Sequence, residues 1–397
     1  MKNINKSKNY KKKPALRFIG FEKNLIEYTL GEIAEINDGT HFTPNYVKRG
    51  VPFYSAENII NKEYPKKFIT TSAHRINSKR IKVEKDDIFF TRLGNIGISC
   101  VYELEEEADF YVSLALIKSN KEIFNSYFLS CYINSTIFKK ELNKRILRIA
   151  FPVRINIKEL RKCRVFLPNI VEQEKISELF KNFNKLIELN ESKLNYFILC
   201  RKAILQKKFT NKEKNNSEKI LGDICNEVNE RNDKWIYKRV LSLSKSRGVI
   251  EQKEQFTREV ASKDLRKYKV IKKGMFAFNP TRVDGGAINQ LVNYEDGVLS
   301  STYVVFEASW EVNTEYLQYF FQSSAFKNKV PMYMEGCVRN ALSYKSFSKI
   351  KLTFPSLKEQ EKIVELIKIM DKKISLQKEL IKLLEKEKVA IAQKMLI

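Results

Sequence analysis

The stretch FPSLKEQEKIVELI, Phe354 to Ile367, repeats an earlier stretch of the same chain, LPNIVEQEKISELF, Leu167 to Phe180. Residues 167–209 align with residues 354–396 without a gap, and the aligned segments close on AILQK and AIAQK. The chain therefore contains two copies of one segment. The fold depends on what this segment forms.

Both copies contain the start signals of a helix. A proline ends the preceding element, and a polar residue, Asn169 or Ser356, follows at the N-cap position. Three residues later, Glu172 or Glu359 is placed to complete a capping box. The segments that follow lack Gly and Pro, so each predicts a helix of about 38 residues, about 57 Å long at 1.5 Å per residue.

Helices of this length with apolar residues at spacings of three and four indicate a coiled coil. Asn190 and Gln377 interrupt the two apolar seams at equivalent positions, as expected for polar residues that fix the register of a paired coil. The alternative is that each helix packs only on its own neighbouring domain. The predicted coiled-coil and docking residues are Ile176, Leu179, Phe183, Leu186, Asn190, Leu194, Ile363, Leu366, Met370, Ile374, Gln377, Leu380 and Leu384.

The repeat extends beyond the helices. LGEIAEIND, Leu30 to Asp38, resembles LGDICNEVN, Leu221 to Asn229, and TRLGNIGIS resembles TRVDGGAIN. Strand-like and helix-like segments alternate in both copies, which predicts an α+β fold with two similar globular domains. The predicted boundaries are a basic disordered tail 1–17, a first domain 18–167, a long helix 168–209, a polar linker 210–219, a second domain 220–353 and a second long helix 354–397.

The net charge and the residue types present limit the classes of function that the chain can have. The chain has 73 basic and 47 acidic residues, a net charge of +26, which favours nucleic acid as a partner. A compositional bias towards lysine is the alternative explanation. Six dispersed cysteines and two histidines predict a reducing cytoplasm and no metal site, and no apolar run is long enough to span a membrane. The chain has no P-loop, and we expect no catalytic centre in it.

The paired LP…EQEKI and FP…EQEKI helices, the LRFIGF…LGEI segment and the DGTHFTPNYVKRGVPFYSAENI segment resemble the specificity (S) subunit of type I restriction-modification systems. The resemblance covers nearly the whole chain. It implies two target recognition domains, each reading one half of a bipartite DNA site, and two antiparallel helices that set the spacer. It also implies two modification (methyltransferase) subunits and restriction or motor subunits as partners. S-adenosylmethionine, ATP and Mg²⁺ would be bound by those partners, and this chain would bind no cofactor.

Two other functions remain open from the residues alone. One is a coiled-coil assembly or scaffold protein whose charge reflects composition only. The other is a duplicated DNA-binding specificity module that works outside a restriction system. The first predicts no sequence-selective DNA binding, and the second predicts DNA binding without a separate modification partner.

Loop residues are the candidates for DNA contact, because bidentate Arg to guanine and Asn or Gln to adenine are the commonest side-chain readers of bases. Arg92 and Arg282 lead this set, since they occupy equivalent positions beside glycines. Their alternative role is a salt bridge, exposed or buried. The predicted DNA-binding residues are Thr40, His41, Thr43, Tyr46, Ser55, Asn58, Arg92, Asn95, Arg148, Arg154, Arg247, Asn279, Thr281, Arg282, Asp284, Arg339 and Asn340.

Overall fold

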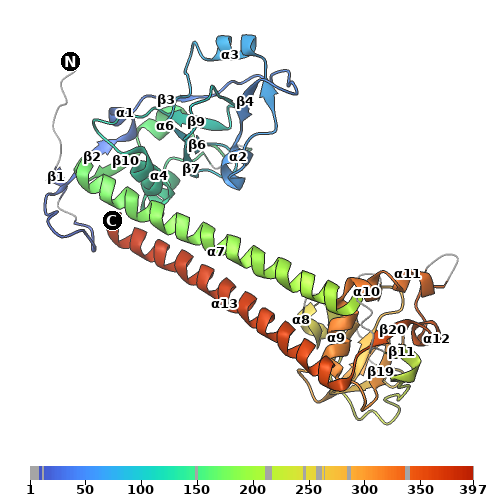
Figure 1. Cartoon of the computed structure of the whole chain (residues 1–397). Helices are drawn as coiled ribbons and strands as arrows, with labels where there is room; N and C mark the ends of the chain where they lie inside the picture. Colours follow the sequence, from blue (N-terminus) through green and yellow to red (C-terminus); the bar gives the residue numbers. More distant parts are fainter. Residues whose placement is uncertain are drawn as a thin grey trace. The chain divides into compact units, whose positions relative to one another are not determined.

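The structure is a computed structural model that describes residues 9–10, 13–147, 151–210, 217–244, 247–255, 262, 264–283, 288–335 and 340–396. The chain divides into two compact units. The first unit comprises Met1–Glu191 and Leu380–Ile397, and the second comprises Ser192–Glu379. Each unit contains one globular domain together with parts of both long helices (Figure 1).

The globular domain of the first unit contains three small sheets. Their strand orders are β3-β9-β6-β7, β5-β4-β8 and β1-β2-β10, and all pairs are antiparallel except β4 with β8. The strands are β1 (Asn9–Tyr10), β2 (Leu25–Thr29), β3 (Ile36–Asp38), β4 (Val51–Tyr54), β5 (Phe68–Ile69), β6 (Ile88–Thr91), β7 (Ser99–Val101), β8 (Asp109–Phe110), β9 (Leu114–Ile117) and β10 (Arg164–Leu167). The short helices are α1 (Leu30–Ile33), α2 (Ala56–Asn61), α3 (Thr71–Asn77), α4 (Ser126–Asn134), α5 (Thr136–Asn143) and α6 (Ile157–Arg161).

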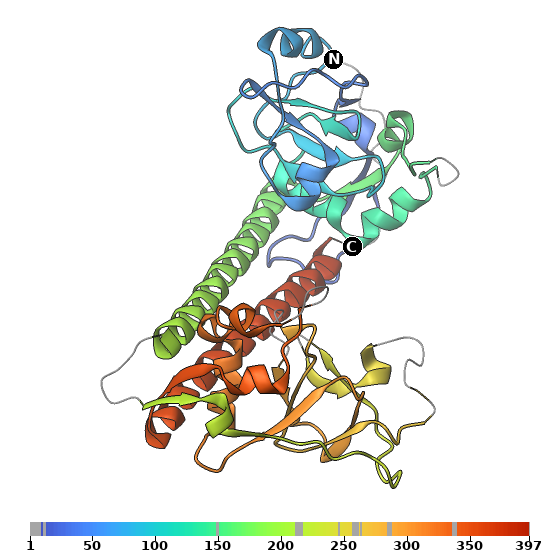
Figure 2. The same cartoon turned by 90° about the vertical axis from the view of Figure 1, so that its right-hand side faces the viewer.

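The second unit is built on the same plan, and Figure 2 turns its strands towards the viewer. Its strand orders are β12-β19-β16-β17, β11-β20, β13-β14 and β15-β18. The strands are β11 (Ser217–Ile220), β12 (Cys225–Glu227), β13 (Leu241–Ser244), β14 (Gly248–Glu251), β15 (Lys269–Lys272), β16 (Phe276–Phe278), β17 (Ile288–Gln290), β18 (Asp296–Leu299), β19 (Val304–Ala308) and β20 (Lys351–Phe354). The short helices are η1 (Leu221–Asp223), α8 (Gln252–Gln255), α9 (Thr314–Gln322), α10 (Ser324–Lys327), α11 (Val330–Tyr333) and α12 (Tyr344–Ser348).

The four-stranded sheets show that the two domains are copies of one fold. In both sheets a strand from the middle of the domain, β6 or β16, lies between a late strand and the strand that follows it in sequence. Both central strands are buried along their whole length. In the first domain Phe90 faces one hydrophobic cluster and Phe89 faces another on the opposite side of the sheet. In the second domain Phe278 and Ala277 are divided between two clusters in the same way. The predicted α+β class and internal repeat are confirmed.

The two long helices are α7 (Ile170–Thr210) and α13 (Leu357–Met395). In the first unit, the C-terminal Met395 packs into the same hydrophobic cluster as Ile176 near the start of α7. In the second unit, Lys208 near the end of α7 pairs with Glu359 near the start of α13, at 3.2 Å. Helix starts therefore lie beside helix ends in both units, which is the antiparallel arrangement predicted for the coiled coil.

The buried positions correct part of the predicted seam. Leu186, Leu366 and Leu380 are exposed, whereas Ile367 and Ile381 are buried and Ile187 is half-buried. Each error falls on a pair of adjacent apolar residues, where counting cannot decide which one faces inwards. The observed seam has the alternating three- and four-residue spacing of a coiled coil. It comprises Ile176, Phe180, Phe183, Ile187, Asn190, Leu194 and Phe197 on α7, and Ile363, Ile367, Met370, Ile374, Gln377, Ile381 and Leu384 on α13.

The predicted capping box is half correct. The Asn169 side chain accepts a hydrogen bond from the Glu172 backbone N–H at 2.9 Å, as an N-cap does. The Glu172 carboxylate, however, is buried and accepts from the Arg17 guanidinium, with Nε at 2.8 Å. Glu359 likewise pairs with Lys208. An ion pair with a nearby cation satisfies a buried carboxylate better than one backbone N–H does.

Candidate nucleic-acid interface

Arg92, directly after strand β6, has only 7% of its surface exposed. Its Nη1 donates to Asp38 Oδ2 at 2.9 Å, and its Nε donates to the Ile155 carbonyl at 3.2 Å. Burial, and then the charges of Arg154 and Arg80, lower the pKa of Arg92. The structure thus places Arg92 in the buried ion pair that the sequence analysis offered as its alternative role. A direct DNA contact by Arg92 stays a prediction.

Asp38, at the end of β3, accepts contacts from three cationic or titratable side chains. Besides Arg92, the Arg80 guanidinium forms an ion pair with it and donates to the Asp38 carbonyl at 2.9 Å. His41 Nε2 lies 3.0 Å from Asp38 Oδ2. Asp38 therefore joins a buried arginine to the base of the DGTHFTPNY loop.

The loop itself, residues 41–46, presents side chains to solvent. His41, Thr43 and Tyr46 are exposed, and Thr40 is half-buried at the loop base. Tyr46 packs on Phe53 with ring centroids 5.9 Å apart. These four predicted contact residues are brought together on one surface.

The equivalent turn of the second unit is different. Arg282 is exposed, and its backbone N–H donates to the Asn279 carbonyl at 3.0 Å. The Asn279 side-chain oxygen accepts from the Thr281 hydroxyl at 2.9 Å, so Asn279 shapes the turn that presents Arg282. The residue that matches Asp38 in the sequence repeat is Asn229. In the fold, however, the position of Arg92 is held by Pro280: the Pro280 carbonyl accepts from the Leu342 N–H at 2.9 Å, as the Arg92 carbonyl accepts from the Ile155 N–H at 3.1 Å. Arg282 lies two residues farther along the turn, at its exposed part.

Asn95 and Arg154 are exposed on neighbouring segments. Asn95 lies in the turn between β6 and β7, where its carbonyl accepts from the Thr91 hydroxyl at 2.6 Å. The Gly94 N–H donates to the Val153 carbonyl at 2.9 Å, which brings this turn beside Arg154.

The other candidates are scattered. Ser55 and Asn58 bond to each other at 3.0 Å and cap α2, so their polar atoms are partly used locally. Arg247 lies 3.8 Å from the Glu254 carboxylate. Asn340 is exposed. Three predicted contact residues lie outside the described residues, namely Arg148, Asp284 and Arg339.

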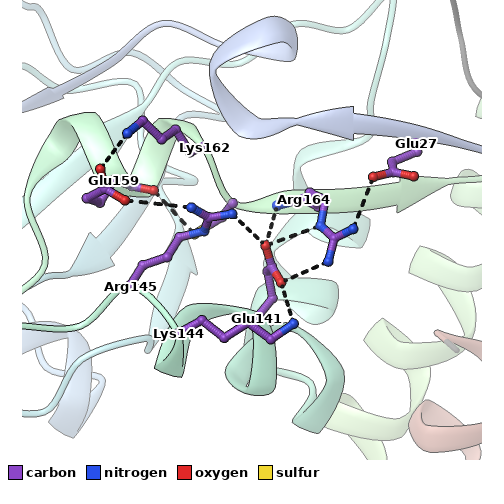
Figure 3. Close-up of polar contacts among 8 residues, drawn as sticks. Glu27, Glu141, Lys144, Arg145, Glu159, Lys162 and Arg164 are labelled. Atoms are coloured by element: carbon purple, nitrogen blue, oxygen red, sulfur yellow. Dashed lines mark hydrogen bonds and ion pairs between the residues drawn. The ribbon is translucent and has the colours of Figure 1, made fainter.

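Sequence reasoning missed a polar network in the first unit, which Figure 3 shows. Glu141 on α5 accepts from Arg145 at 3.0 Å, from Lys144 at 3.1 Å and from Arg164 on β10 at 3.4 Å. Arg145 also lies 3.6 Å from Glu159 on α6. Burial alone would raise the pKa of Glu141, but the three cationic donors outweigh it and lower that pKa to about 2. The network ties α5 and α6 to β10, the strand that leads into α7.

The described part of the chain contains neither a metal cluster nor a membrane-spanning helix. No group of three or more His, Cys, Asp or Glu side chains there is arranged to hold a metal ion. None of the described helices is both long and apolar enough to cross a membrane.

Comparison with known proteins agrees with this architecture. Residues 22–196 and 207–386 each match the model of the type I restriction modification DNA specificity domain. A putative type I restriction enzyme MjaX specificity subunit of Methanocaldococcus jannaschii is 23% identical over 94% of this chain and 94% of its own length. The MjaVIII specificity subunit of the same organism is 28% identical over 30% of this chain and 28% of its own length.

Solved structures share the fold. One is from a study of complex assembly and conformational transition of a type I restriction-modification system, with a TM-score of 0.62, 13% identity and coverage of 95% of this chain and 98% of that one. Another is the S subunit from M. genitalium, with a TM-score of 0.54, 14% identity and coverage of 97% and 99%. Two matched domains, two repeated sheets and two long helices lead to one conclusion: the chain belongs to the family of type I restriction-modification specificity subunits.

Proposed function

We propose that each globular domain reads one half of a bipartite double-stranded DNA site and that the long helices set the distance between the halves. The net charge of +26 supplies attraction to phosphates that does not depend on sequence. Exposed loop side chains then distinguish bases in the grooves.

One observation carries this proposal. The turn after the central strand is equivalent in the two domains, yet it presents different groups. In the first domain Arg92 is withdrawn into an ion pair with Asp38, whereas in the second Pro280 takes that position and Arg282, two residues farther along, is exposed. A shared framework with different exposed groups is what two unlike half-sites require.

The outer faces of the long helices are proposed to bind two modification subunits. Leu189 and Tyr196 are exposed on α7, and the residues equivalent to them, Leu376 and Leu383, are exposed on α13. Exposed apolar residues at matching positions of a repeat suit two copies of one partner. Of the predicted docking residues, Leu186, Leu366 and Leu380 are exposed and the others are buried or half-buried, so these four join those three as the docking candidates.

The chemistry is proposed to belong to the partners. Modification subunits would bind S-adenosylmethionine and methylate the site, and restriction or motor subunits would use ATP and Mg²⁺ for cleavage. This chain would select the DNA site and bind the partner subunits together, in the cytoplasm.

The test is to co-express the chain with its modification subunit and to map methylated adenines across the host genome. The proposal expects one split motif with two defined halves around a fixed gap. If a complex that assembles and binds the methyl donor adds no methylation, the proposal fails, and the result favours the assembly-protein alternative. DNA binding without a modification partner would favour the independent specificity module.

A further inference from the structure

We propose that Phe42 reads the C5-methyl group of a thymine in the half-site bound by the first domain. The inference rests on the proposed function and names a base-reading side chain that the sequence patterns did not indicate. Phe42 lies between His41 and Thr43 in an otherwise polar loop, and 84% of its surface is exposed. Covering such a ring with an apolar group of a partner gains free energy in proportion to the apolar area removed from water.

The loop that carries Phe42 is held at both ends. At its start, the Thr40 N–H donates to the Phe110 carbonyl at 3.0 Å, and the Thr40 carbonyl accepts from Val112 at 2.9 Å. At its end, the Val47 N–H donates to the Phe68 carbonyl at 2.9 Å. The ring is therefore presented on a short segment between two fixed points, which limits the conformational entropy lost on binding.

The base of the loop also requires a close backbone approach. A Cβ atom added at Gly39 would lie 2.1 Å from the Phe110 carbonyl oxygen, so only glycine fits there. Beside it, the Asp38 carboxylate is held by Arg92 from the interior and by Arg80 from the surface. These contacts fix the path of the chain immediately before the exposed ring.

The surroundings of Phe42 favour DNA over a protein partner. The negative charge of Asp38 is offset by its own cationic contacts. The loop continues into exposed Lys48 and Arg49, and Lys67 Nζ lies 5.0 Å from the centroid of the Tyr46 ring. An apolar ring among cations matches a surface where phosphates flank base edges.

The thymine methyl is the apolar group of the major-groove edge, and phenylalanine is one of the side chains that contact it. The hydroxyls of Thr40 and Thr43 and the imidazole of His41 can hydrogen-bond to the polar base atoms around the methyl group. The geometry therefore assigns Phe42 an apolar contact within a mainly polar reading loop.

The test uses the complex of this chain with its modification subunits and duplexes that contain the mapped site. Each thymine of the first half-site is replaced in turn by deoxyuridine, which lacks only the methyl group. Dissociation constants are measured for the wild type and for Phe42→Ala, Phe42→Leu and Trp310→Ala. Trp310 is the matched control, since it is an aromatic residue with 88% of its surface exposed in the second unit.

One deoxyuridine position is expected to weaken wild-type binding about fivefold, the effect of one lost methyl contact. Phe42→Ala should weaken binding to the thymine duplex by a similar factor and should not respond to deoxyuridine at that position. Phe42→Leu should keep part of the response, and Trp310→Ala should keep all of it.

Three results would overturn the inference: unchanged affinity of Phe42→Ala, parallel deoxyuridine responses in the wild type and Phe42→Ala, or a first half-site without thymine on either strand. In all three the wild type still binds its site, so the proposed function survives. A wild-type complex that binds no specific site rejects the proposed function, and the inference falls with it.

Discussion

Gln173 and Gln360 occupy equivalent positions in the two long helices and make the same hydrogen bonds. Each side-chain amide donates to the carbonyl of the proline before its helix, at 2.9 Å for Gln173 and 3.0 Å for Gln360. Each side-chain oxygen accepts from the N-cap backbone N–H of a short helix, at 2.9 and 3.0 Å. Both side chains are almost completely buried. The EQEK repeat therefore encodes the joint between each globular domain and its long helix.

Replacing Gln173 by alanine should destabilise the first unit by about 2–3 kcal/mol, because three backbone groups, the Pro168 and Ile123 carbonyls and the Asn125 N–H, lose their partner. The measurement is urea-induced unfolding followed by hydrogen exchange of α4. Gln393→Ala, at an exposed position of α13, is the control. A loss no larger than that of the control would show that the Gln173 bonds contribute little.

The ion pair between Arg201 and Asp371 in the second unit has a weaker counterpart in the first, where Lys388 meets Asn184. Burial lowers the pKa of Lys388. Asn184→Asp would restore the missing carboxylate, so we expect about 1 kcal/mol of added stability for the first unit.

The check is thermal unfolding of Asn184→Asp at neutral pH with and without high salt. The gain should shrink in salt, because a half-exposed ion pair is screened. Asp371→Asn is the reverse variant and should destabilise the second unit. Equal unfolding temperatures for Asn184→Asp and the wild type would contradict the prediction.

Glu141 should make the free energy of unfolding of the first unit depend on pH in the acid range. Its pKa is about 2 in the folded protein, below its ordinary value of 4.5. A carboxyl with a depressed folded pKa contributes stability above its unfolded pKa and loses it as pH falls towards the folded value. Between about pH 4.5 and pH 2, the wild type should lose about 1–2 kcal/mol more than Glu141→Gln, after allowance for solvent screening. Unfolding at several pH values measures this, with exposed Glu178→Gln as the control. Parallel pH profiles would rule out the role given to Glu141.

Alanine substitutions of Arg92 and Arg282 should affect different properties: the first should lower stability, and the second should weaken DNA binding. Arg92→Ala removes the buried partner of Asp38 and should cost about 2–4 kcal/mol of unfolding free energy. Arg282→Ala should leave stability within about 0.5 kcal/mol, since the side chain is exposed. If Arg282 contacts a phosphate, its loss should weaken DNA binding and reduce the salt slope by about one. Unfolding curves and salt-dependent affinities of both variants test this, and a stable Arg92→Ala would refute it.

Leu189→Asp and Leu376→Asp should each remove one of two bound modification subunits, because a charge on the docking stripe carries a desolvation cost. Mass measurement of the assembled complex should show one modification subunit in place of two. Ser192→Asp adds the same charge at another exposed position of α7 and should keep both subunits. Two bound subunits in all three variants would place the docking surface elsewhere.

The sequence alone was sufficient for the repeat, the two long helices and the α+β class, because these depend on local signals. Proline and N-cap residues mark a helix start, and the absence of Gly and Pro over the aligned segments marks its length. The resemblance in the same segments pointed to the family. None of these inferences needed to know which residues meet in space.

Only the tertiary structure decided which member of each apolar pair enters the seam. Leu366 and Ile367 are similarly apolar, and adjacent residues lie only about 100° apart around a helix, yet Ile367 is buried and Leu366 is exposed. The tertiary structure also decided that Arg92 is buried and Arg282 exposed, although their sequence contexts match. The reason lies in contacts with distant segments: the Arg92 carbonyl accepts from Ile155 and its side chain pairs with Asp38, whereas in the second copy Pro280 makes the matching contact, with Leu342, and Arg282 falls two residues farther along. The net free energy of burying a charge depends on what lies opposite it in the fold, and that is set by long-range packing.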